Sequence, residues 1–408
     1  MRNDRLDRLA EFPFRRLAAL LAHERPPAGP TLDLALGEPR HAPPALLAET
    51  VAAHAHLWNR YPPVLGTPEF REAACAWLTH RFDLPAGALD PERHVVPVAG
   101  TKEALYLLPA VLTSGDRSPL VLMPDPVYAV YYGGAVMAGA TPVLLPATAA
   151  TGFLPDLEAL STDQLDRAAL LYLCSPANPQ GAVADRDYLR RAVRLARRHG
   201  FVLAVDECYS ELWDRQPTPG ALEAALAEDG SLAQVLVFHS LSKRSSAPGL
   251  RSGFVAGDPE LIARLVRLRA YASPVQPLPL LAAATALWRD EAHVEANQAR
   301  YRAKFDLAQH RIGNRFGFYR PAGGFFLWLD VGDGEEAARR LWREAGVRVL
   351  PGGYLSAGEG AANPGGRYIR VALVDELETV GEALGRLSDV LGHGNLRARG
   401  DFDGRVDR

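Results

Sequence analysis

The chain has 408 residues, of which 48% are hydrophobic and 23% charged, and its formal net charge is −3. This composition is ordinary for a soluble globular enzyme, and the length predicts two domains. The small net charge gives no electrostatic basis for binding nucleic acid or an anionic membrane surface. No apolar run is long enough for a signal segment or a membrane span. The three cysteines form neither a C-x-x-C pair nor a disulfide framework, so we expect a reducing, cytoplasmic location.

The N-terminal part of the chain predicts helices and one short strand. Residues 5–25 place apolar and charged side chains at helical spacing, which indicates an amphipathic helix. Residues 31–39 predict a short strand that ends in a turn. Two prolines at 43–44 open a helix that runs to about residue 57. A loop over 59–70 leads into another helix, which ends near residue 80.

The middle of the chain repeats a unit of apolar strand, polar loop and helix. We predict seven strands, at residues 95–98, 120–123, 142–145, 169–174, 201–205, 235–238 and 252–257. Helical patterns lie between most of them, including residues 102–112, 185–199 and 221–227. Strands that alternate with helices favour an α/β fold with a parallel or mixed sheet. Because the strands are almost continuously apolar, we expect both faces of the sheet to be covered.

The last third of the chain differs from the middle and predicts a smaller α+β domain. A long helical stretch at 279–316 leads into residues 317–331, which have a strand–turn–strand pattern. A helix at 335–345, a strand at 366–373 and a final helix at 376–391 follow. Residues 394–408 are charged and poor in apolar side chains, which predicts a flexible tail.

Polar residues follow several of the predicted strands, where open α/β sheets collect their ligands. Gly100, Thr101 and Lys102 open a helix whose free amide groups suit a phosphate, although an ordinary threonine cap explains the same pattern. Tyr128 can stack on a flat cofactor or fill the core. Asn178 can donate to a phenolate oxygen or form a turn. The sequence contains neither a Walker A loop nor a G-x-G-x-x-G, which argues against nucleotide triphosphates and dinucleotides.

Two further strand ends carry a carboxylate and an amine. Asp206 ends a buried strand, where a carboxylate is costly without a cation, and a protonated pyridine nitrogen satisfies that need. Lys243 ends the next strand in the run Ser240-Leu-Ser242-Lys243, and it is one of only three lysines in the chain. Burial and nearby cations lower the pKa of such a lysine and make its amine nucleophilic. Arg251 follows, and an arginine suits bidentate contact with phosphate.

A heteroaromatic ring, a phosphate, a phenolic oxygen and an aldehyde together describe pyridoxal 5′-phosphate. The motifs LGEP, YPPVLGTPEFREA, AGTKEAL, PDPVYAVY, SPANPQG, DECY, SLSKRSSAPGLRSG and GRYIRVAL occur in this order. With them the chain resembles the class I/II aminotransferase family of fold type I pyridoxal-phosphate enzymes over nearly its whole length. The resemblance implies a large domain at 46–284 with a mostly parallel seven-stranded sheet, and a small domain built from 1–45 and 285–393. It also implies a homodimer that acts on amino acids and 2-oxo acids.

Site roles follow from the resemblance, motif by motif. Lys243 would form the internal aldimine and shuttle the proton, and Asp206 would pair with the pyridinium nitrogen. Asn178 and Tyr209 would contact the ring oxygen, and Tyr128 would stack on the ring. The phosphate would be held by Gly100, Thr101, Lys102, Ser240, Ser242 and Arg251, with Tyr61 reaching it from the partner subunit. Arg370 would bind the substrate α-carboxylate near Gly37, with Asn178 also at the substrate. No metal is expected.

The motifs around Lys243 and Gly37 are most similar to bacterial succinyldiaminopimelate transaminases of lysine biosynthesis. This implies transfer of an amino group from glutamate to N-succinyl-2-amino-6-oxopimelate. Arg40 and Arg244 lie beside these motifs and are candidates for binding the distal acidic arm, or they are structural. An aminotransferase for aspartate, alanine or acetylornithine-like substrates remains an alternative, and so does a C–S lyase or decarboxylase on the same fold.

Two readings from other classes of protein are weaker. The run from Ser240 to Lys243 also matches the S-x-x-K of penicillin-recognising serine enzymes, but the companion S-D-N and K-T-G elements do not occur in the sequence. A regulatory protein that uses the aminotransferase fold usually carries a DNA-binding helix-turn-helix domain. The segment before Gly37 is too short for one.

Overall fold

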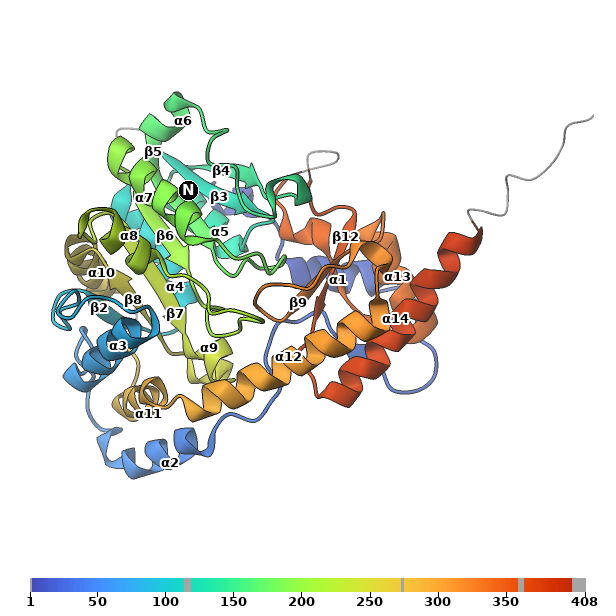
Figure 1. Cartoon of the computed structure of the whole chain (residues 1–408), viewed down its shortest axis with the longest axis horizontal. Helices are drawn as coiled ribbons and strands as arrows, with labels where there is room; N and C mark the ends of the chain where they lie inside the picture. The colour runs from blue at the N-terminus through green and yellow to red at the C-terminus, as the bar shows by residue number, and fades with distance from the viewer. Residues whose placement is uncertain (1, 114–118, 273–274, 359–362, 398–408) are drawn as a thin grey trace, which may run out of the picture.

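The computed structural model describes residues 2–113, 119–272, 275–358 and 363–397. A seven-stranded sheet with the order β2-β8-β7-β6-β5-β3-β4 forms its largest layer (Figure 1). The strands are β2 Val95–Val98, β3 Leu120–Asp125, β4 Thr141–Pro146, β5 Ala168–Cys174, β6 Val202–Asp206, β7 Val235–Ser240 and β8 Gly253–Gly257. β8 pairs antiparallel with β2 and β7, and the other pairs are parallel, so the predicted mostly parallel sheet is confirmed.

Helices cover both faces of this sheet, as the apolar strands predict. One face packs against α3 Pro68–Arg81, α7 Arg186–His199, α8 Ala221–Asp229 and α11 Leu278–Arg289; the other packs against α4 Thr101–Leu112, α5 Ala129–Met137 and α10 Pro259–Ala272. Successive side chains of a strand point to opposite faces. On β6, Leu203 and Val205 therefore enter one core, whereas Val202 and Ala204 enter the other. Burial on both sides fixes the register of the strands.

A second core lies beside the large sheet. The antiparallel sheet β11-β12-β9 and the parallel pair β1-β10 build it, with strands β1 Leu32–Asp33, β9 Phe326–Asp330, β10 Val347–Arg348, β11 Leu350–Pro351 and β12 Tyr368–Ala372. The helices around it are α1 Pro13–Leu21, α12 Ala292–Ile312, α13 Gly334–Ala345 and α14 Leu377–Arg397. Figure 1 shows α12 leading from the side of the large sheet to this second part, where it lies along α14. The domain boundaries drawn from the sequence stay a prediction.

Shorter elements complete the described chain. The remaining α-helices are α2 Ala45–Ala53, which packs on α11, α6 Thr162–Arg167 and α9 Leu241–Arg244. The 3₁₀ turns are η1 Leu6–Arg8, η2 Ala55–Leu57, η3 Ala149–Thr151, η4 Pro248–Leu250, η5 Arg315–Gly317 and η6 Gly352–Leu355.

The termini of several predicted elements were wrong. The single helix expected at 5–25 is a 3₁₀ turn followed by α1, which starts at Pro13 because proline suits the first helical position and not the interior. The strand expected at 31–39 shrinks to Leu32–Asp33. The helical stretch at 279–316 is two helices, because Asp290 adopts an extended conformation between α11 and α12.

The strand–turn–strand expected at 317–331 contains one strand. Residues 326–330 form β9, whereas the residues before it form a loop tied to the large sheet's side by a bridge between Trp213 and Gly323. The first residues of the tail expected at 394–408 are helical, because α14 continues through Arg397. Residues 398–408 of that prediction lie outside the described residues.

Among the described residues, no helix combines the length and apolar character needed to cross a bilayer. The same residues contain no group of three or more His, Cys, Asp or Glu side chains that could hold a metal ion.

Candidate active site

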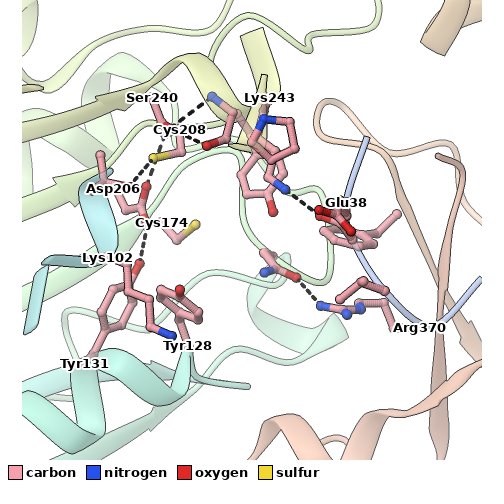
Figure 2. A pocket seen from close by; sticks show the side chains of 18 of the residues that line it. Glu38, Lys102, Tyr128, Tyr131, Cys174, Asp206, Cys208, Ser240, Lys243 and Arg370 are labelled. Atoms are coloured by element: carbon pink, nitrogen blue, oxygen red, sulfur yellow. Dashed lines mark hydrogen bonds between the residues drawn. The ribbon is translucent and has the colours of Figure 1, made fainter. Parts of the chain in front are cut away.

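A cavity of about 570 Å³ lies at the carboxyl ends of the central strands, between the large sheet and the second core. Most of the site residues predicted from the sequence line it: Gly37, Thr101, Lys102, Tyr128, Asn178, Asp206, Tyr209, Ser240, Ser242, Lys243, Arg251 and Arg370. Figure 2 shows Asp206 on one side of this cavity and Arg370 on the other, with Lys243 directed into the space between them.

Lys243 lies in α9, the one-turn helix that starts where β7 ends. The side chain of Ser240 accepts a hydrogen bond from the Ser242 amide at 3.1 Å and so turns the chain into this helix. The Lys243 Nζ donates to the backbone carbonyl of Gly37 and lies 5.1 Å from the centre of the Phe325 ring. Burial lowers the pKa of Lys243 to about 8. A neutral, nucleophilic amine is therefore accessible near physiological pH.

Asp206 is the last residue of β6 and lies at the base of the cavity. Its Oδ2 accepts from the Tyr131 hydroxyl at 2.7 Å, and its Oδ1 accepts from the Cys208 amide at 3.2 Å. Burial raises the pKa of Asp206, while these two hydrogen bonds oppose the rise. Among the described residues it is oriented by hydrogen bonds and not by a lysine or arginine. A buried carboxylate held in this way calls for a cationic partner in the cavity.

The start of α4 and the loop after α9 build a cradle for an anion. Gly100 has a φ of +80°, and a Cβ atom there would lie 2.1 Å from Nη2 of Arg251. Only glycine allows the helix N-terminus and the guanidinium to approach this closely. The first amide groups of α4 have no acceptor within the helix. The hydroxyls of Ser240 and Ser242, 3.0 Å apart, lie at the same end of the cavity.

Arg370, on β12, gives the opposite side of the cavity a buried positive charge. Its Nη1 donates to Asn178 Oδ1 at 3.1 Å and its Nη2 to the Ala35 carbonyl at 2.9 Å. The guanidinium stacks 4.3 Å from the ring centre of Phe326, and its Nε has no hydrogen-bond partner among the described residues. Burial lowers the pKa of Arg370 to about 10. A cation buried against neutral groups favours an incoming carboxylate.

The two tyrosines predicted at the cofactor ring both face the cavity. The ring of Tyr128 lies 5.5 Å from that of Tyr131 in an edge-on arrangement, and Tyr209 packs edge-on against Phe325 at 5.4 Å. Burial raises the pKa of both phenols, so they are neutral donors. Tyr61 does not line the cavity; its side chain is fully exposed. Its predicted contact with a partner's phosphate therefore stays a prediction.

Neither arginine proposed for the distal substrate arm lines the cavity. The prediction that Arg244 contacts the substrate is wrong. Its side chain is buried, donates to the Leu287 carbonyl at 2.7 Å and pairs with Glu291 at 2.5 Å. Arg40 is bound to Asp375 at 2.6 Å. Both arginines hold the fold together.

Sequence reasoning missed several lining residues. Tyr131, the hydrogen-bond donor to Asp206, lies in the first turn of α5, three residues after Tyr128, the N-cap of that helix, and this spacing was a usable signal. Cys208 lies within the DECY motif, and its Sγ is 3.1 Å from Thr101 Oγ1. Glu38, Phe14 and Phe326 also line the cavity. Glu38 follows Gly37 in the LGEP motif, which was a usable signal, whereas no local pattern distinguishes Phe14 and Phe326 from ordinary core residues.

The residues present fit pyridoxal phosphate. The buried Asp206 is suited to a protonated pyridine nitrogen, the amine of Lys243 to an aldehyde, and the cradle around Gly100 to a phosphate. The Nε of Arg370, which has no hydrogen-bond partner among the described residues, is available to donate to a substrate carboxylate in the same cavity.

Comparison with known proteins decides the family. The family model "Aminotransferase class I and II" matches residues 30–387. The chain is a class I/II aminotransferase. Members of this family depend on pyridoxal phosphate, so the cofactor predicted from the strand ends is confirmed.

Two curated relatives are similar to this aminotransferase over almost their whole length. The LL-diaminopimelate aminotransferase of Desulforudis audaxviator is 33% identical over 398 residues, which cover 95% of this chain and 97% of the relative. The 4-dedimethylamino-4-oxo-anhydrotetracycline transaminase OxyQ of Streptomyces rimosus is 36% identical over 385 residues, which cover 93% of this chain and 99% of the relative. Relatives at this similarity therefore differ in substrate.

Two solved structures share the fold of this aminotransferase. An aminotransferase from Neisseria meningitidis has a TM-score of 0.91 and 35% identity, covering 96% of this chain and 100% of that one. A probable N-succinyldiaminopimelate aminotransferase from Thermus thermophilus has a TM-score of 0.81 and 27% identity, covering 92% of this chain and 99% of that one. The fold is that of fold type I pyridoxal-phosphate enzymes.

Proposed function

We propose that this aminotransferase moves an amino group from glutamate to N-succinyl-2-amino-6-oxopimelate, in the cytoplasm and as a homodimer. The substrate class is inferred from Arg370, which lines the same cavity as Lys243. Its guanidinium is buried, and its Nε has no hydrogen-bond partner among the described residues. An α-carboxylate bound there places the reacting carbon of an amino acid near the lysine amine. The motif resemblance and the name of one similar structure, a probable N-succinyldiaminopimelate aminotransferase, support the particular acceptor.

The chain's own residues divide the work of amino transfer. When bound, pyridoxal phosphate supplies an electron sink for the bond that breaks at the substrate Cα. Arg370 holds the substrate α-carboxylate, and Asp206 keeps a proton on the ring nitrogen. The Nζ of Lys243 accepts the proton that leaves the substrate Cα and later releases it. Its lowered pKa allows both steps near neutral pH. Asn178 fixes Arg370 through the bond from Nη1.

The distal arm of this acceptor ends in carboxylates and needs positive charge at the cavity mouth. Lys102 lines the cavity, is exposed, and extends its Nζ to 5.4 Å from the centre of the Phe12 ring. Its predicted place was at the cofactor phosphate. The exposed position of Lys102 suits a distal substrate carboxylate equally well. We therefore assign to Lys102 the distal contact that was predicted from the sequence for Arg40 and Arg244.

One observation favours a second candidate, LL-diaminopimelate itself as amino donor. Glu38 also lines the cavity and brings a carboxylate to it. A distal ammonium group, which LL-diaminopimelate has and the succinylated acceptor lacks, would bind this carboxylate favourably.

Steady-state kinetics with purified enzyme separate these candidates. We expect kcat/KM to be highest for the succinylated acceptor when it is compared with LL-diaminopimelate, with the 2-oxo acids of aspartate and alanine, and with the semialdehyde that corresponds to N-acetylornithine. Lys102→Met should lower kcat/KM for the succinylated acceptor by about ten-fold while changing that for the alanine pair little, because only the distal contact is lost. If another substrate is best by a clear margin, the acceptor assignment fails and the aminotransferase assignment stands.

A further inference from the structure

Lys304 is a buried cation that the proposed reaction does not use. It lies on α12, its side chain is 1% exposed, and its Nζ donates to the Leu373 carbonyl at 2.9 Å. The same Nζ lies 2.7 Å from Nε2 of His41, and His41 Nδ1 lies 2.9 Å from Oε1 of Glu376. We call Lys304, His41 and Glu376 the Lys304 relay. Burying an ammonium group costs free energy, and hydrogen bonds must compensate for that cost.

The relay has one consistent arrangement of protons. Burial, followed by the charge of Lys304, lowers the pKa of His41, so the imidazole is neutral. A neutral imidazole that accepts from Lys304 at Nε2 must carry its proton on Nδ1, where it donates to Glu376. Lys304 thus fixes the tautomer and orientation of His41 from inside the protein.

The segment that starts at His41 and runs back to Ala35 reaches the active site. Arg40 reinforces its outer end, because its amide donates to the Val374 carbonyl at 3.3 Å and its guanidinium binds Asp375 at 2.6 Å. At its inner end, the Ala35 carbonyl accepts from Arg370, and the Gly37 carbonyl accepts from Lys243. One short stretch of backbone therefore joins the Lys304 relay to both cations of the cavity.

Aromatic rings make a second connection between the two lysines. The Nζ of Lys304 lies 4.5 Å from the ring centre of Tyr301, whose ring stacks on Phe325 at 5.4 Å with an interplanar angle of 27°. On the far side, Phe325 lies 5.1 Å from the Nζ of Lys243. Loss of Lys304 would loosen both the backbone segment and this stack.

We infer that Lys304 is a positioning residue: through His41 it holds residues 35–41 over the cavity, so that the Gly37 carbonyl keeps the Lys243 amine oriented and shielded from water. The inference rests on the proposed role of Lys243. It adds that the orientation of Lys243 depends on a residue outside the cavity, on a helix of the second core.

Acylation of the apoenzyme tests this without catalysis. Trace labelling with acetic anhydride across a pH series, read by peptide mass spectrometry, gives the pKa of Lys243, because the chain has only three lysines, on separate peptides. In Lys304→Met we expect the pKa of Lys243 to rise from about 8 toward the ordinary lysine value, since burial is the main cause of its shift and the cover above it is lost. In the holoenzyme, kcat should fall about 10²-fold.

Two matched variants make the result decisive. Lys304→Arg keeps a donor for His41 and should restore a lowered pKa of Lys243. Arg302→Met, on the same helix, removes a cation that lies over the Trp213 ring and should leave the pKa of Lys243 unchanged. If Lys304→Met folds and the pKa of Lys243 stays at about 8, or if Arg302→Met shifts it equally, the inference is wrong.

A second route covers the case in which Lys304→Met does not fold. The Glu376 side chain is 76% exposed, so Glu376→Ala should fold, and it removes the acceptor of the hydrogen bond from His41 Nδ1. We expect the pKa of Lys243 to move in the same direction, by less; no movement would overturn the inference. Failure of the proposed function would instead show as a borohydride-reduced adduct on another lysine of the holoenzyme or as a preference for another substrate, and neither result depends on the labelling of the apoenzyme.

Discussion

At the scale of single residues, burial accounts for most of the chemistry of the cavity. The largest cause of the lowered pKa of Lys243 is its removal from water, and the positive charges of Arg370 and Arg251 add to it. The same removal from water raises the pKa of Asp206, and its hydrogen bonds oppose that rise. The site thus holds an amine that can lose its proton and a carboxylate that can hold a cation, in one cavity.

The first residue-scale prediction concerns the lysine that binds the cofactor. Borohydride reduction of the holoenzyme should fix the cofactor to Lys243, and Lys243→Ala should fold but lose amino transfer. The reactive form is the neutral amine, so the rate at which apoenzyme takes up the cofactor should rise with pH and level off above about 8. Peptide mapping and stopped-flow absorbance measure the two effects. A reduced adduct on Lys102 or Lys304 would contradict the assignment.

At the scale of elements, the sequence predicted the large sheet well and the second core poorly. Strands buried on both faces have apolar runs such as residues 235–238 that stand out locally. The two-residue strands β1, β10 and β11 have no such run, and their pairing depends on residues far apart in the chain. The same distinction applies to the site. Strand ends indicated Asp206 and Lys243, whereas the Gly37 carbonyl was recognisable as the partner of Lys243 only from the three-dimensional arrangement.

The element-scale prediction concerns the start of α4. Gly100→Ala should weaken cofactor binding strongly, because the new Cβ would lie 2.1 Å from Arg251 and the residue has a φ of +80°. Gly87→Ala is the control: its φ of +78° is also positive, but nothing lies within 4 Å of the new Cβ. We expect both variants to lose about 1 kcal/mol of stability from the backbone. Only Gly100→Ala should release the cofactor, as measured by equilibrium dialysis, and equal retention in both would refute the cradle.

At the scale of the whole molecule, the cavity needs contributions from chain segments that are distant in sequence. Gly37 comes from the N-terminal segment, Lys243 from the large sheet and Arg370 from the second core. The exposed segment around Tyr61 is unusual for a protein surface: Trp58 is 53% exposed, Leu65 37% and Tyr61 fully. Large apolar side chains gathered in one exposed stretch are typical of an interface. This is the stretch that we propose completes the site of a second copy.

The last prediction follows from that proposal. If Tyr61 donates its hydroxyl to the phosphate in the partner's cavity, Tyr61→Phe should raise the cofactor dissociation constant about ten-fold, the cost of one hydrogen bond to a charged group. Tyr271→Phe removes a hydroxyl from a similarly exposed tyrosine, 91% exposed on α10, and serves as the control. Mixing inactive Lys243→Ala with the weakened variant Tyr61→Ala should restore activity, because one cavity of each mixed dimer then has both native residues. A fully active monomer, or a mixture no more active than its parts, would show that each chain builds its site alone.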